Sequence, residues 1–173
     1  MSEKANLPED NLERGLTVAS SLEGKFERPH IGLVGDTYTI LLSGKDTAGR
    51  YCLIDMYVPP GGGPPPHRHD YEESFTVLEG EVEMVFRGVK ATVRAGEVAS
   101  IPANAPHRFK NESQGAARLL CVCSPAGLDE LFVALGVPVA TRTTPPPRLS
   151  AAEQAAFREK AAALAGRYRT EFL

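Results

Sequence analysis

The feature that most constrains the fold is a series of short apolar segments between Thr37 and Cys123. Gly, Pro or Asn lies between most of these segments, and such residues form tight turns. Many short strands joined by turns are typical of an all-β sandwich or closed barrel. No internal repeat is visible, so we predict one barrel rather than two. The segments are YTILLS, YCLIDMYV, SFTVL, EVEMVF, KATVR, EVASI, HRFKN and ARLLCVC.

The size of the chain also favours a single domain. Its 173 residues, 42% of them hydrophobic, are enough to form one packed core. We divide the chain into an N-terminal arm (1–30), a barrel with a following short helix (31–137), and a Pro-rich linker with a C-terminal helix (138–173). The arm is polar and weakly periodic, so we assign it no chemistry.

Two helices are predicted after the barrel strands. The segment LDELFVAL at 128–135 has helical spacing and is followed by Gly136, a common helix stop. Ser150 and Glu153 form a capping-box signature for a second helix, which we expect to run to about Gly166.

Charge and hydropathy narrow the range of partners. The formal net charge is −3 and the Lys and Arg residues form no basic run, so we expect no nucleic-acid partner. No stretch approaches the roughly 18 apolar residues of a membrane span, and the N-terminus lacks the apolar region of a signal peptide. We therefore expect a cytoplasmic protein, without a membrane partner, that binds a small molecule.

Cys52, Cys121 and Cys123 lie in apolar runs and are odd in number, which is typical of buried free thiols. Strand alternation would direct Cys121 and Cys123 to the same face, so a metal or redox pair is an alternative. A single intervening residue would strain a disulfide between them. We interpret all three as structural.

Three of the four histidines fall within one pattern. His67 and His69 are two residues apart, so on a strand their rings leave the same face. Glu73 shares their parity, whereas its neighbour Glu72 is expected to point the other way. The full pattern is Gly61, five residues, His67, one residue, His69, three residues, Glu73, six residues, Gly80.

A second block supplies a further histidine. A strand ends at Ile101, a tight turn follows, and a new strand begins at His107, which a barrel would bring beside the first block. Three imidazoles and one carboxylate would then converge, a set suited to one divalent ion of Fe, Mn, Ni, Co, Cu or Zn. The block reads Gly96, five residues, Pro102, Ala103, Asn104, two residues, His107, three residues, Asn111.

Both blocks closely resemble the two motifs of the cupin superfamily. The first, PPGGGPPPHRHDYEESFTVLEGE, is similar to small single-domain bacterial cupins grouped with quercetin dioxygenases. The resemblance covers residues 51–137 and implies a double-stranded β-helix, or jelly-roll, barrel. It also implies four metal ligands, namely His67, His69, Glu73 and His107. One departure is Asn104, where the second motif usually has Gly. Because Asn tolerates the left-handed conformation, we expect the turn to be retained.

The function implied by this resemblance is a metal-dependent, quercetinase-like dioxygenase acting on an enol-type or flavonol-like small molecule. Three neutral imidazoles and one carboxylate would leave a divalent ion with net charge near +1 and with open positions, which suits an anionic oxygen. Glu73 would be catalytic, by accepting the substrate proton. Two alternatives stay open, a metal-dependent isomerase and a non-catalytic small-molecule-binding or regulatory cupin, because fold alone does not choose among them.

We also expect a homodimer. The N-terminal arm and the exposed edge strands of an antiparallel barrel favour pairing between chains, and related cupins commonly exchange or add strands there. Asp55 and Tyr57 share one strand face, but alternation cannot say whether that face is inside the barrel or outside.

Overall fold

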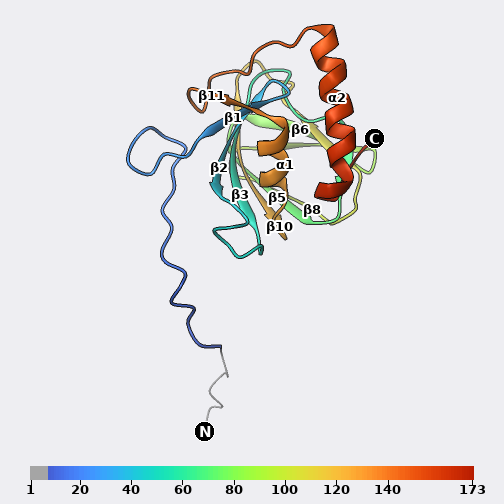
Figure 1. The fold of residues 1–173 in the computed structure, drawn as a ribbon. Coiled ribbons are helices and arrows are strands. Elements are labelled where there is room, and N and C mark those ends of the chain that lie inside the picture. The colour runs from blue at the N-terminus through green and yellow to red at the C-terminus, as the bar shows by residue number, and fades with distance from the viewer. Residues whose placement is uncertain (1–7) are drawn as a thin grey trace.

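The computed structural model describes residues 8–173 and shows a barrel of two antiparallel sheets with two helices (Figure 1). This confirms the predicted all-β fold with a short helix after the barrel and a C-terminal helix. The first sheet has the order β11-β1-β2-β3-β10-β5-β8, and the second has the order β12-β4-β9-β6-β7. Residues 1–7, part of the predicted arm, lie outside the described residues.

Most strands coincide with the apolar segments of the sequence. The first sheet contains β1 (His30–Leu33), β2 (Asp36–Leu42), β3 (Cys52–Val58), β5 (Glu72–Glu79), β8 (Val98–Ile101), β10 (Ala117–Ser124) and β11 (Val137–Val139). The second contains β4 (His67–His69), β6 (Glu81–Phe86), β7 (Val89–Arg94), β9 (His107–Lys110) and β12 (Thr170–Phe172).

Strict alternation along the central strands forms the core. On β10, every second residue from Ala117 to Cys123 is buried, and the residues between them are partly exposed. On β3 the inward face is apolar, so Asp55 lies on the opposite face, where it is also buried and forms an ion pair with Arg118 at 2.6 Å. Phe75 and Phe109 face each other from the two sheets, with ring centroids 5.2 Å apart. Burying one such aromatic side chain stabilises the fold by about 1.5–3 kcal/mol.

The helices cover the barrel from one side (Figure 1). Helix α1 (Leu128–Leu135) has the predicted bounds, and its Phe132 ring packs on Tyr38 at 4.3 Å. Helix α2 (Ala151–Ala165) begins with the predicted capping box at Ser150 and ends before a short 3₁₀ turn, η1 (Gly166–Tyr168). Within residues 8–173, neither helix is both long and apolar enough to span a bilayer.

Strand β1 lies outside the predicted segments, and two still shorter strands were not predicted from the sequence either. Strand β11 pairs with β1, and β12 pairs with β4, the strand that carries two of the motif histidines. Three-residue strands carry too little alternation to be recognised. They form because the neighbouring edge strands offer unpaired backbone groups. Pro138 lacks an N–H group, which fits its place in the edge strand β11.

One buried carboxyl group stands apart from the apolar core. Asp36, at the start of β2, is fully buried, and its Oδ2 accepts a hydrogen bond from the Tyr38 hydroxyl at 3.0 Å. Among the described residues, its Oδ1 has no hydrogen-bond partner. Burial outweighs the hydrogen bond from Tyr38 and raises the pKa of Asp36 to about 7.

This pKa predicts a pH-dependent stability. Unfolded Asp36 titrates near 4, so between about pH 4 and pH 7 the folded protein holds a proton that the unfolded chain has lost. The free energy of unfolding should therefore fall as pH rises through this window, by an amount on the order of 4 kcal/mol. Asp36→Asn cannot ionise, so it should lose less stability between pH 5 and pH 8 than the wild type. Urea unfolding followed by circular dichroism measures the difference, and equal losses in both proteins would contradict the assignment.

Candidate metal centre

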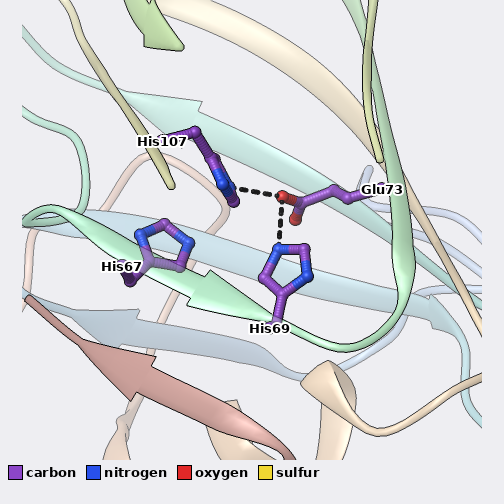
Figure 2. A group of neighbouring side chains, drawn as sticks. All are labelled: His67, His69, Glu73 and His107. Carbon is purple, nitrogen blue, oxygen red and sulfur yellow. Dashed lines mark hydrogen bonds and ion pairs between the residues drawn. The ribbon is translucent and has the colours of Figure 1, made fainter. Parts of the chain in front are cut away.

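The four side chains of the motif meet inside the barrel, between the two sheets (Figure 2). His67 and His69 lie on β4, and His107 lies on the adjacent β9, directly opposite His67. Glu73 comes from β5 in the other sheet, because the chain crosses between the sheets at Asp70 and Tyr71. One ligand atom from each of the four residues lies within 4.8 Å of the others. The predicted residues are therefore brought together from three strands, β4, β5 and β9.

The rings are oriented by backbone carbonyl groups behind them. In each ring Nδ1 donates to a carbonyl oxygen two residues away, which places a proton on Nδ1, so that in the neutral ring the Nε2 lone pair faces the centre of the cluster. The three hydrogen bonds run from His67 to Pro65 at 2.9 Å, from His69 to Tyr71 at 3.0 Å, and from His107 to Ala105 at 2.9 Å.

The spacing of the ligand atoms fits a divalent ion. Oε2 of Glu73 lies 3.0 Å from Nε2 of His69 and 3.1 Å from Nε2 of His107, as the dashed lines in Figure 2 show. In the neutral Nδ1–H rings, lone pairs face a carboxylate at this distance, so the contacts require a positive charge between them, either a metal ion or a proton on Nε2. Two ligand atoms at right angles on an ion, with bonds of about 2.1 Å, are about 3 Å apart.

The protonation states of Glu73 and His67 match those of metal ligands. Burial alone would raise the pKa of Glu73, but the imidazoles of His107 and His69 hold it well below its usual range, so the carboxylate is charged. Burial lowers the pKa of His107, but its contact with Glu73 outweighs burial and raises that pKa, so a proton on Nε2 of His107 can take the place of a metal ion beside Oε2. Burial, followed by the nearby His107, lowers the pKa of His67 to about 4, so this ring is neutral at pH 7. Ionised carboxylates and neutral imidazoles are the forms that bind metal ions.

Two backbone contacts hold the motifs against each other. Asn104 adopts the expected left-handed conformation, with φ of 66°, and its N–H donates to the carbonyl of His69 at 2.6 Å. Gly63, with φ of 125°, lies so close to β9 that a Cβ atom there would be 2.3 Å from the carbonyl oxygen of Phe109. The first motif is thus positioned by direct contact with the second.

Three residues beside the cluster were not assigned to the site from the sequence. The Tyr71 ring stacks on His69, with centroids 3.9 Å apart and planes within 2°. The second carboxylate oxygen of Glu73, Oε1, lies 3.3 Å from Sγ of Cys121 and 3.5 Å from Sγ of Cys123. Alternation had placed both thiols on one face, but it did not show which group they would meet.

A large cavity leads to the cluster. Its volume is about 1290 Å³, and His67 and Glu73 form part of its wall. His69 and His107 are buried behind them. Helices α1 and α2 close one side of the cavity, and most of the remaining wall is apolar. Aromatic and thioether side chains in the wall include Tyr38, Met56, Phe75, Phe109, Phe132 and Phe157.

Comparison with known proteins agrees with this architecture. Residues 54–123 match the Cupin domain family. The chain is 35% identical over 54% of its length to endoribonuclease YbeY of Myxococcus xanthus (strain DK1622), and 26% identical over 72% of its length to quercetin 2,3-dioxygenase of Bacillus subtilis (strain 168). The matched regions are only 29% and 37% of those two proteins.

A solved structure shows the same fold. An RmlC-like cupin from Shewanella frigidimarina NCIMB 400 superposes with a TM-score of 0.52 at 18% identity, covering 66% of this chain and 99% of that one. The domain match covers the strands that carry the four candidate ligands. With both sequence motifs placed on a two-sheet antiparallel barrel, residues 54–123 match a cupin domain in sequence and in fold.

Proposed function

We propose that this chain is a metal-dependent dioxygenase that acts on an apolar, enol-type small molecule such as a flavonol. The observation that carries the proposal is the position of Glu73 and His67 at the wall of a large, mostly apolar cavity. Small-molecule sites commonly have volumes of about 300–1,000 Å³ and combine apolar walls with a few polar groups. A cavity of about 1290 Å³ accommodates a multi-ring substrate.

The residues that would hold the metal ion are His67, His69, Glu73 and His107. A divalent ion bound there would supply a Lewis-acidic position for an anionic oxygen of the substrate. Fe, Mn, Ni, Co, Cu and Zn all suit three imidazoles and one carboxylate.

Glu73 is the proposed proton acceptor. Its carboxylate is charged and buried and forms part of the cavity wall, so it is placed to accept a proton from a substrate enol that a bound ion would make more acidic. The aromatic wall contacts the rings of the substrate and excludes water, which would otherwise return a proton to the enolate. The fixed imidazoles keep the carboxylate oriented, because His69 and His107 both face Oε2.

The first test concerns the metal ligands. His69→Ala removes one of four ligands, so it should weaken metal affinity by about 100-fold or more. Loss of a group that only hydrogen-bonds to a ligand already weakens metal affinity by about 10–100-fold. The matched control is His30→Ala, because His30 is also buried on a strand but bonds to Thr39 outside the cluster. Elemental analysis and metal titration measure the effect. Equal affinity in His69→Ala and wild type would remove His69 from the site.

The second test separates catalysis from binding. At saturating metal, Glu73→Gln should still bind a flavonol but turn it over about 10²–10⁴-fold more slowly, because the proton acceptor is lost. Oxygen uptake measures turnover, and the shift in melting temperature measures binding. A wild type that binds a flavonol, diketone or hydroxy acid but consumes none, with any candidate metal, would instead be a binding module.

The predicted homodimer remains a proposal, and the arm supports it. Residues 8–19 extend away from the barrel in Figure 1, with Leu12 and Leu16 about nine-tenths exposed. Val98 on the edge strand β8 is also exposed. Apolar side chains on an extended arm and an unpaired strand edge favour pairing with a second chain.

Sedimentation at micromolar concentration tests this proposal. The full chain should have the mass of two chains, and removal of residues 1–19 should yield a monomer, because the arm supplies the exposed apolar contacts. A monomeric full chain would contradict the dimer, and a dimeric truncated chain would place the contact elsewhere.

A further inference from the structure

Two thiols lie directly behind the carboxylate of Glu73. Cys121 and Cys123 are on β10, which pairs with β5 so that Cys123 is opposite Glu73. Both thiols are fully buried, and their sulfur atoms are 3.6 Å apart. Their distances to Oε1, 3.3 Å and 3.5 Å, are those of S–H groups that donate to a carboxylate oxygen. No other donor to Oε1 is found among the described residues.

The two carboxylate oxygens therefore have separate surroundings. Oε2 faces the imidazoles of His69 and His107, and Oε1 faces only the thiols. A buried carboxylate oxygen with no donor would be costly, so the thiols reduce the free-energy cost of burying the charge. Because a thiol is a weak donor, it satisfies Oε1 while withdrawing little electron density from the carboxylate.

We propose that Cys121 and Cys123 are positioning residues for the ligand Glu73. Their S–H groups hold Oε1 at the back of the barrel and so direct Oε2 toward His69 and His107. The carboxylate then offers a single oxygen to the ion rather than both. This inference rests on the proposed metal site, but it does not depend on which reaction the site performs.

A pair of double variants distinguishes this role from packing. Replacement of both cysteines by Val keeps an apolar side chain of similar size but removes the donors. Replacement of both by Ser keeps donors but introduces polar groups into the core. We call these double variants the Val pair and the Ser pair. A role in positioning predicts that the Ser pair binds metal as the wild type does, whereas a role in packing predicts that the Val pair does. The control in the same part of the core is Cys52→Val and Cys52→Ser, since Cys52 is equally buried and lies opposite Cys123 but has no hydrogen bond to Glu73.

Co²⁺ is a suitable probe, because its visible absorption reports the number and type of ligands. We expect the Val pair to bind Co²⁺ about 10–100-fold more weakly than the wild type and to show an altered d–d spectrum. The Ser pair should stay within about threefold of the wild type with an unchanged spectrum. Both Cys52 variants should bind Co²⁺ as the wild type does. Thermal unfolding of the metal-free proteins checks that each variant is folded. If the Val pair does not fold, the single variant Cys121→Val replaces it, because the Cys121 thiol is the closer of the two to Oε1 of Glu73.

Several outcomes would overturn the inference. Wild-type affinity and spectrum in the Val pair would show that the thiols only fill space. A sulfur-to-cobalt charge-transfer band in the wild type would show that the thiols are ligands rather than positioning residues. If the wild type bound no Co²⁺, the metal site itself would be wrong, and the positioning role would be rejected with it. Tight wild-type binding with an unaffected Val pair rejects the positioning role alone.

Discussion

The site depends on the hydrogen bonds that fix the three imidazole rings from behind. Each Nδ1 donates to a backbone carbonyl at 2.9–3.0 Å, so the tautomer and direction of each ring are set by the path of the main chain. These carbonyl groups lie in the turns that flank β4 and β9. The positions of the turns, held by contacts such as that between Asn104 and His69, therefore determine the geometry of the cluster.

Glu73 joins the two halves of the barrel. It is the one member of the cluster that comes from the first sheet, and it faces imidazoles on one side and thiols on the other. A buried carboxylate needs positive charge and donors to offset its desolvation. The imidazole side is where an ion fits, and the thiol side supplies only weak donors. The arrangement holds the charged carboxylate of Glu73 in place while Glu73 still forms part of the cavity wall.

The relation between sequence and structure differs from one element to the next. Helix α1 and the start of α2 were predicted correctly, because Gly136 and the capping box at Ser150 are local signals. The short strands β11 and β12 were missed, because they form only by pairing with β1 and β4. The direction of Asp55 was open in the sequence, since alternation fixes which residues share a face but not which face lies inside the barrel.

The sequence by itself determined the all-β barrel, the two helices and the four residues of the cluster, because alternation, turn residues and motif spacing are properties of short segments. Only the tertiary structure decided how those residues converge. His69 and Glu73 share strand parity, yet they meet because the chain crosses between sheets at Tyr71, whose ring then stacks on His69. The register of β10 and β5 brings the thiols of Cys121 and Cys123 to Glu73, although they are 48 and 50 residues away from it along the chain. Contacts between distant strands are set by sheet pairing, and no local pattern encodes them.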